Sequence, residues 1–168
     1  MLVRRAEPGD EEAVARVHVR SWQAAYRGLL PDDYLDRLSP ADRAARYTFA
    51  EIGPGSPQTT VAVGEHGICG FTTSGPCRDA DKDGAGELYA IYVHPDWWNR
   101  GVGRLLIENV RSRLSQERFS EAALWVLAGN ERAERFYRID GWKPDGQRRL
   151  QDVHGITVDE IRYSRPLI

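Results

Sequence analysis

The sequence predicts a single α/β (α+β) domain, covering residues 1–168, in which a mixed central sheet of about seven strands is flanked by about four helices. Three observations predict this fold class. Runs rich in β-branched and aromatic residues interrupt runs of helical periodicity in the order β-αα-βββ-α-β-α-ββ, which fits neither a regular doubly wound fold nor an antiparallel sandwich. A chain of 168 residues can bury a core without disulfides. Hydrophobic residues make up 41% and charged residues 29%, an ordinary globular balance.

The first part of the chain predicts one strand and two helical regions. The strand covers residues 2–6, and Asp10 is placed to cap a helix that continues to about Tyr26. A second helical region follows over residues 31–50. It is interrupted near Pro40, because proline cannot continue a helix.

The middle of the chain predicts strands. After a loop over residues 52–58, β-rich runs over 59–63 and 68–74 predict a hairpin. The polar, glycine-rich stretch 77–86 predicts a mobile loop. The run ELYAIYV, residues 87–93, predicts a strand of aromatic and β-branched residues.

The last part predicts two helices and three strands. A helix over residues 101–116 carries one apolar stripe, and a buried strand over 122–127 follows it. Strand, helix and strand in this succession imply a parallel crossover. A short helix over 130–140 and a hairpin over 148–163 complete the predicted sheet.

Charge and cysteine content exclude several classes of protein. The formal net charge of −2 argues against a general binder of nucleic acid or anionic membranes. No apolar run is long enough for a membrane span, and the first residues lack the apolar core of a signal peptide, so we expect a cytoplasmic protein. Cys69 and Cys77 form no CxxC pair, and no histidine cluster has metal spacing. We therefore expect reduced thiols and no metal.

The stretch VHPDWWNRGVGRLLIENV, residues 93–110, predicts a phosphate site. A strand that runs directly into a helix start presents unpaired backbone N–H groups and the positive end of the helix dipole. Gly101 and Gly103 would let the backbone approach an anion, and Arg100 and Arg104 would add charge. The stretch matches neither the P-loop nor the dinucleotide fingerprint. A plain tight connection between strand and helix is the alternative.

A second motif, LWVLAGNERAERFYRIDGW, covers residues 124–142. Asn130 and Tyr137 are seven residues apart on a predicted helix, which places both side chains on one face, two turns apart. Taken alone, Asn130 is equally well explained as a helix cap and Tyr137 as a core aromatic residue.

Together the two motifs resemble those of the GCN5-related N-acetyltransferases, VHPxxxxRGVGRLL followed by LxVLxxNxxAxxFYxxxGW. The resemblance covers the chain from Leu2 to about Tyr163. It implies that acetyl-CoA lies in a cleft where two neighbouring parallel strands splay apart, here residues 87–93 and 122–127.

The resemblance also implies roles toward acetyl-CoA for individual residues. The backbone of Ile91 and Val93 would pair with the pantetheine amides, as an added strand would. Asn130 would hydrogen-bond the pantetheine arm. Trp98 stands where relatives usually carry Gln or Arg, so a side-chain contact to phosphate is missing, for which Arg100 could compensate. The pyrophosphate would lie on the backbone N–H groups of Asn99, Arg100, Gly101, Val102, Gly103 and Arg104.

The implied chemistry contains two proton transfers. Tyr137 would point its hydroxyl at the thioester sulfur and give a proton to the leaving thiolate. An amine is mostly protonated near neutral pH, so it needs a base. Glu87, at the start of the central strand, is the candidate, directly or through a water, with a solvated strand-end charge as the alternative. Cys69 and Cys77 have no partner base, so we expect direct transfer without a covalent enzyme intermediate.

The acceptor side is less defined. Trp22 and Tyr26 share one helix face and would line an amine site, or they pack in the core. Asp32 and Asp33 could attract a cationic amine, or they are ordinary helix-start carboxylates. Trp97, with Trp98, could shelter the cofactor or cover a core edge.

The expected function is transfer of an acetyl group from acetyl-CoA to the primary amine of a small molecule or a peptide N-terminus. Exposed aromatic residues would permit a homodimer. An acyl-CoA-binding regulatory module with the same fold and little turnover is the alternative, and an enzyme using another phosphate-bearing cofactor is a third.

Overall fold

The computed structural model describes residues 1–50, 55–153 and 155–167. The strands are β1 (Leu2–Arg5), β2 (Gln58–Gly64), β3 (Gly67–Pro76), β4 (Gly86–Val93), β5 (Glu121–Leu127), β6 (Lys143–Val153) and β7 (Ile156–Pro166). The helices are α1 (Glu11–Ala25), α2 (Asp32–Asp36), α3 (Pro40–Ala44), α4 (Val102–Gln116) and α5 (Glu131–Ile139), with short 3₁₀ helices η1 (Ala80–Lys82) and η2 (Pro95–Trp97). This succession confirms the predicted fold class. None of the helices in the described ranges is long and apolar enough to cross a lipid bilayer.

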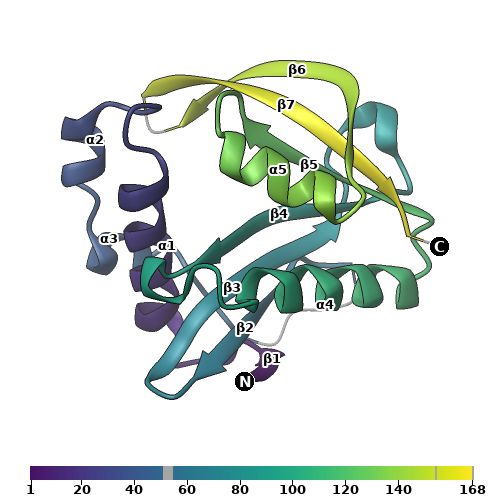
Figure 1. Cartoon of the computed structure of the whole chain (residues 1–168). Helices are drawn as coiled ribbons and strands as arrows, with labels where there is room; N and C mark the ends of the chain where they lie inside the picture. The colour runs from purple at the N-terminus through teal and green to yellow at the C-terminus, as the bar shows by residue number, and fades with distance from the viewer. Residues whose placement is uncertain (51–54, 154, 168) are drawn as a thin grey trace.

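The strands form one seven-stranded sheet in the order β1-β2-β3-β4-β5-β7-β6 (Figure 1). Within the described residues, β4 and β5 are the only two strands that pair in parallel, and α4 connects them. The predicted crossover is therefore confirmed. It places the start of α4 directly after the end of β4.

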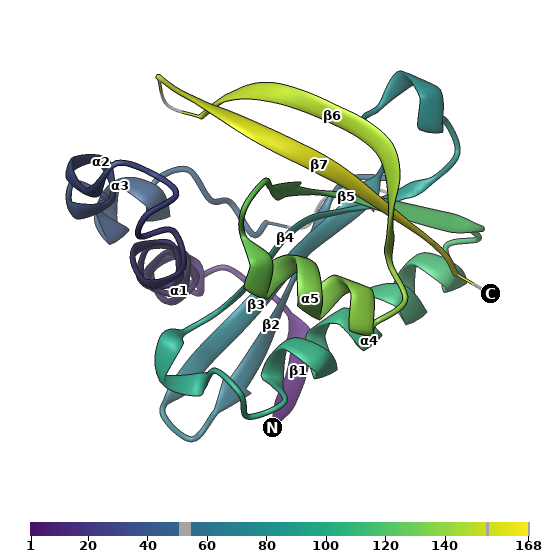
Figure 2. The same ribbon diagram turned by 45° about the horizontal axis from the view of Figure 1, so that its top comes forward.

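Helices cover both faces of the sheet. In β4, alternate side chains point to opposite faces. Ala90 and Tyr92 pack in the cluster that contains residues of α1, whereas Ile91 and Val93 pack in the cluster that contains residues of α4. Figure 2 shows α1 on one side of β2 and β3 and α4 on the other.

The two parallel strands separate after a short paired segment. Their register runs from Gly86 opposite Ala122 to Leu88 opposite Leu124 and then stops. β4 nevertheless continues to Val93 and β5 to Leu127. A register shift against β3 falls at this point in β4, and such a bulge bends a strand. The predicted splay of the two strands is thus present, and it opens a gap in the middle of the sheet.

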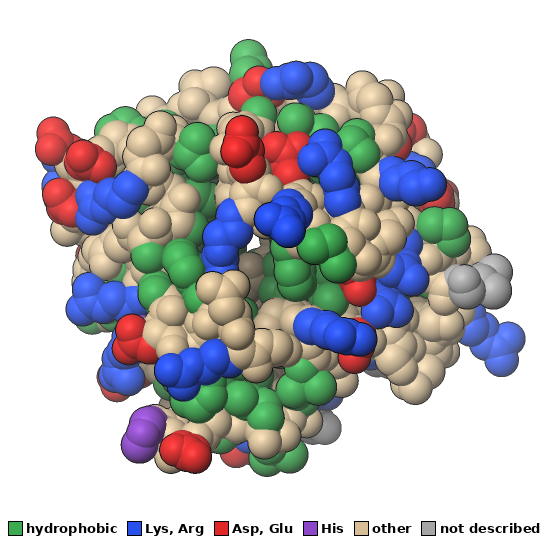
Figure 3. All heavy atoms as spheres, in the orientation of Figure 1, with side chains coloured by type: hydrophobic (Ala, Val, Ile, Leu, Met, Phe, Trp, Pro, Cys, Tyr) green, Lys and Arg blue, Asp and Glu red, His purple; other side chains and the backbone are tan. Residues whose placement is uncertain are grey.

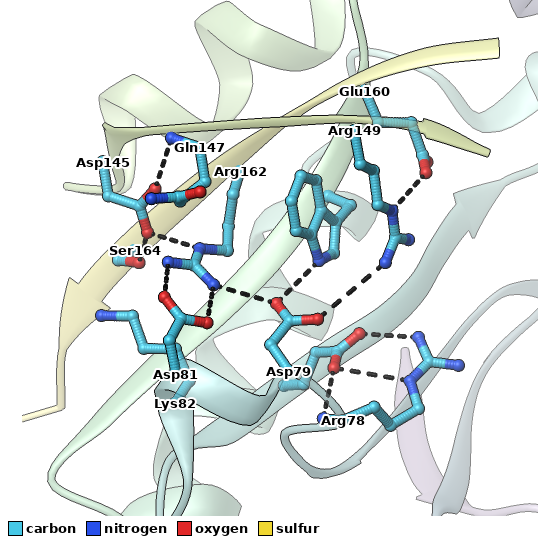
Figure 4. Close-up of polar contacts among 12 residues, drawn as sticks. Arg78, Asp79, Asp81, Lys82, Asp145, Gln147, Arg149, Glu160, Arg162 and Ser164 are labelled. Carbon is cyan, nitrogen blue, oxygen red and sulfur yellow. Dashed lines mark hydrogen bonds and ion pairs between the residues drawn. The ribbon is translucent and has the colours of Figure 1, made fainter.

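The loop between β3 and β4 was predicted to be mobile, and that prediction is wrong. Arg162 of β7 is only 4% exposed and donates hydrogen bonds to Asp79 at 3.1 Å, Asp81 at 2.7 Å and Asp145 at 2.7 Å. Two of these carboxylates belong to the loop (Figure 4). A buried guanidinium therefore fastens the loop to the last strand.

Two predictions for the first part of the chain need correction. Asp10 precedes α1 but caps nothing, because its carboxylate binds the Arg4 guanidinium at 2.7 Å. The second helical region breaks before Pro40, as predicted, but helical structure ends at Ala44 rather than near residue 50. Part of the loop predicted over 52–58 lies outside the described residues.

Candidate active site

A cavity of about 930 Å³ occupies the gap between β4 and β5. Figure 3 shows a hollow near the centre of this face, with Lys and Arg side chains around it. The lining comes from both splayed strands, the start of α4, the cavity-facing side of α5, the C-terminal half of α1 and the end of the β6–β7 hairpin.

One end of the cavity carries free backbone amides. Residues 99–104 connect β4 to the first turn of α4, and none of their N–H groups donates a hydrogen bond to a described residue. Asn99 and Gly101 have left-handed backbone conformations, with φ of 59° and 83°. A Cβ at Gly101 would meet nothing within 4 Å, so this backbone is open to a ligand. Free amides at the start of a 15-residue helix form an anion site.

Gly103 has a packing role that the sequence did not predict. A Cβ at this position would lie 3.3 Å from the ring of Phe136 on α5. This glycine therefore allows α4 and α5 to pack closely beside the cavity.

Arginines supply positive charge at the same end. Arg104 lines the cavity together with Arg132 and Arg135 of α5. The Arg132 guanidinium lies 3.7 Å above the Trp98 ring, a favourable cation–π distance. Arg100 instead lies over Trp97 and does not line the cavity. Arg132, rather than Arg100, therefore brings positive charge to the cavity beside Trp98.

The predicted strand contacts are on the cavity wall. Ile91 and Val93 both line it. The Val93 carbonyl already accepts a hydrogen bond from the Trp98 indole at 2.8 Å. A carbonyl oxygen has two lone pairs, so one remains for a ligand.

Asn130 and Tyr137 also face the same cavity. Asn130 caps α5 through its carbonyl oxygen, which accepts from the Ala133 amide at 3.2 Å, and its NH₂ group stays available as a donor. The Tyr137 hydroxyl makes no hydrogen bond with any residue in the described ranges. Burial, followed by the neighbouring phenol of Tyr92, raises the pKa of Tyr137 above its usual value. The phenol therefore keeps its proton at neutral pH.

The structure does not bring Glu87 to this site. Glu87 lies where β4 and β5 are still paired, opposite Ala123, and it is not among the residues that line the cavity. Its side chain is 2% exposed, and its carboxylate accepts hydrogen bonds from the Arg78 amide at 3.0 Å and the Arg78 guanidinium at 2.6 Å. A carboxylate engaged in this way supports the β3–β4 loop, and we assign it no catalytic role.

The other end of the cavity is aromatic. Trp22 and Tyr26 line it, with ring centroids 5.0 Å apart in an edge-to-face arrangement. Asp32 and Asp33 do not line it. Asp32 instead pairs with Arg27 at 3.3 Å on the surface.

The cysteines have no part in the cavity lining. Cys69 is buried beside α4, and burial raises the pKa of the Cys77 thiol to about 11. Both are therefore poor nucleophiles at neutral pH. In the portion of the chain that is described, no three His, Cys, Asp or Glu side chains come together in a way that could hold a metal.

Sequence reasoning missed several residues that shape the cavity, among them Tyr92, Arg132, Phe136 and Glu160. Phe136 and Arg132 lie inside the second motif. The helical periodicity of that motif could have placed both on the side of α5 that faces the cavity. Glu160 sits on β7, and nothing near it in the sequence points to the site. Only the pairing of β7 with β5, which sets Glu160 opposite Leu127, brings it there.

Comparisons with known proteins agree with this geometry. The Acetyltransferase (GNAT) family matches residues 18–142. The uncharacterized N-acetyltransferase YuaI of Bacillus subtilis is 33% identical over 131 residues, which cover 77% of this chain and 73% of YuaI. A GCN5-related N-acetyltransferase from Rhodopseudomonas palustris has a similar crystal structure, with a TM-score of 0.77, 20% identity, and coverage of 98% of this chain and 94% of that one.

A second solved structure shares the fold. PaiA N-acetyltransferase from Thermoplasma acidophilum, crystallised in complex with coenzyme A, gives a TM-score of 0.70 at 17% identity, with 98% of each chain covered. The family match spans most of the chain, and the relative from Bacillus subtilis agrees with it. The chain therefore belongs to the acetyltransferase (GNAT) family.

Proposed function

We propose that the protein transfers the acetyl group of acetyl-CoA to a primary amine. The observation that carries this proposal is a single cavity with free backbone amides at one end and the unpartnered Tyr137 hydroxyl farther in. That arrangement suits a ligand with a diphosphate at one end and a reactive sulfur at the other. The related PaiA protein has been crystallised with coenzyme A, which supports the same choice of ligand.

The residues present fit acetyl-CoA. Free amides in residues 99–104 would hold the diphosphate, and Arg104, Arg132 and Arg135 would balance its charge. The unpaired edge of β4 beyond Leu88 would pair with the pantetheine amides in the manner of an added strand. The Asn130 NH₂ group would donate to the same arm.

When bound, acetyl-CoA supplies an activated acetyl group as a thioester. An acceptor amine has a pKa of about 10, so two protons must leave its nitrogen during transfer. One ends on the sulfur and the other reaches solvent. Tyr137 holds a proton at its hydroxyl and is the group that would donate it to sulfur. Burial that raises the pKa of this phenol would also raise that of a thiol beside it, so the two groups stay matched.

A binding module without turnover is the second candidate. It would need the amides and the arginines, but it would gain nothing from a buried phenol with no hydrogen-bond partner among the described residues. A hydroxyl that faces the cavity and that no described residue engages is placed to act on a ligand, which favours an enzyme.

Calorimetry and a thiol-release assay test the proposal together. We expect acetyl-CoA to bind at least tenfold more tightly than NAD or ATP, a difference of about 1.4 kcal/mol. Addition of an accepted amine should then release free coenzyme A thiol. Equal binding of NAD or ATP would point to another cofactor. Tight binding of acetyl-CoA without thiol release for any amine would favour the binding module.

A further inference from the structure

The charges that line the cavity are divided between its two ends. Four of the charged lining residues belong to α4 and α5, near the free amides: Arg104, Glu131, Arg132 and Arg135. The fifth, Glu160, lies on β7. It shares its end of the cavity with aromatic and aliphatic side chains of α1, β4 and the hairpin. No Lys, Arg or His among the described residues lines that end.

Neighbouring side chains hold Glu160 in place. Its Oε1 accepts a hydrogen bond from Arg149 Nε at 2.9 Å, and its side chain is 17% exposed. Arg149 lies 4.2 Å above the Trp125 ring, whose Nε1 donates to Asp79 at 2.9 Å (Figure 4). The second oxygen, Oε2, accepts no hydrogen bond from a described residue. Glu160 is thus a fixed carboxylate with one oxygen available to a ligand in the cavity.

The wall beside Glu160 is aromatic. The Trp22 ring lies 5.0 Å from Tyr26 and 6.1 Å from Tyr92, and all three residues line the cavity. Burial raises the pKa of both tyrosines, so their phenols are neutral in the physiological range. Neutral aromatic faces next to a carboxylate favour a cation with an apolar body.

This end of the cavity is covered from one side. The β6–β7 hairpin reaches toward α1 and α2 (Figures 1 and 2). There Val158 packs with Leu30 and Leu35 in one buried cluster, and Trp22 and Tyr26 pack against it. This contact closes one side of the cavity, which favours a compact ligand over an extended polypeptide.

We propose that the acceptor is a compact primary amine on an apolar or aromatic body, with no carboxylate beside its amino group, and that Glu160 selects it by accepting a hydrogen bond from the ammonium. This inference rests on the proposed acetyl transfer. An amino acid would place its carboxylate close to Glu160 with no cationic lining residue to pair with it, and an unpaired charge in a partly buried site is unfavourable.

Matched substrate pairs test the inference on the full-length protein. With acetyl-CoA saturating, we expect kcat/KM for phenethylamine to exceed that for phenylalanine by about tenfold or more, and tyramine to exceed tyrosine likewise. A short peptide with a free N-terminal alanine should be acetylated more slowly than either amine. Equal or faster acetylation of the amino acids or of the peptide would overturn the inference.

A variant pair separates recognition by Glu160 from general effects. Glu160→Gln should raise KM for phenethylamine about tenfold, with a smaller change in kcat and an unchanged acetyl-CoA Kd. The matched control is Asp159→Asn, the adjacent carboxylate on β7, which pairs with Arg148 and does not line the cavity. Asp159→Asn should leave KM, kcat and the acetyl-CoA Kd unchanged.

Failure of the acceptor proposal and failure of the proposed acetyl transfer would give different results. An unchanged KM in Glu160→Gln would contradict the inference alone. So would acetyl-CoA binding without acetylation of either amine. Failure of the wild-type protein to bind acetyl-CoA would instead contradict the proposed function.

Discussion

Replacement of Tyr137 by phenylalanine should lower kcat by about 100-fold or more, since a positioned general acid contributes about 10²–10⁴ to a rate. The hydroxyl makes no hydrogen bond with the described residues, so its loss leaves no partner unsatisfied. The ring contacts with Trp142 and Tyr163 would remain. The acetyl-CoA Kd should therefore stay within about twofold of wild type. Steady-state thiol release and calorimetry measure the two quantities.

Tyr163→Phe is the matched control. Its hydroxyl donates to Glu134 at 2.7 Å, and it does not line the cavity, although its ring lies 6.2 Å from that of Tyr137. Its kcat should remain near wild type. Comparable losses in the two variants, or less than about threefold loss in Tyr137→Phe, would remove Tyr137 from the role of proton donor.

Replacement of Arg162 by methionine should lower the free energy of unfolding by about 3–5 kcal/mol. The guanidinium is buried and serves three carboxylates. Two of these, Asp79 and Asp145, have side chains only 14% and 18% exposed, so they would be left as poorly solvated charges. Urea unfolding followed by circular dichroism measures the loss.

Arg148→Met is the control for this variant. Arg148 pairs with Asp159 on the surface, where both side chains are largely exposed, so its loss should cost at most about 1 kcal/mol. A loss below about 1 kcal/mol in Arg162→Met would show that the buried network contributes little to stability.

The effect of Arg162 should depend on pH. Burial by itself would raise the pKa of Asp145, but hydrogen bonds from Ser164 and Arg162 outweigh it and hold the pKa below its usual value. A carboxyl group with a lowered folded pKa stabilises the fold above its unfolded pKa of about 3.9. That contribution is lost as the pH falls through the lower folded value. The difference in the free energy of unfolding between wild type and Arg162→Met should therefore have its full size at pH 7 and become smaller below about pH 4.

Local patterns in the sequence were sufficient for most of the fold. The aromatic and β-branched run of β4 and the apolar stripe of α4 specify their own secondary structure, and their order in the chain specifies the crossover. The two motifs also located the free amides of residues 99–104 and the shared face of Asn130 and Tyr137. Each of these features depends on residues within one or two turns of each other.

The features that the sequence did not reveal depend on distant residues. The loop over residues 77–86 has the composition of a mobile segment, but its Asp81 binds Arg162, which lies 81 positions later. Glu87 has the type and place of a catalytic base, but the pairing of β4 with β5 and the contact with Arg78 fix its carboxylate outside the cavity. Glu160 reaches the cavity only through the order of strands in the sheet.

Gly103 shows a different limit of prediction from sequence motifs. A glycine in a phosphate-type motif is readily assigned to ligand binding. Its neighbour in space, Phe136, lies on another helix, and a Cβ at position 103 would crowd that ring at 3.3 Å. Spacing within a motif carries no information about such a contact.

The most direct test of the account is a crystal structure of the protein with coenzyme A. We expect the diphosphate oxygens within about 2.7–3.2 Å of backbone nitrogens in residues 99–104, and the sulfur facing the Tyr137 hydroxyl between β4 and β5. Coenzyme A bound outside the gap between these strands, or a sulfur remote from Tyr137, would contradict it.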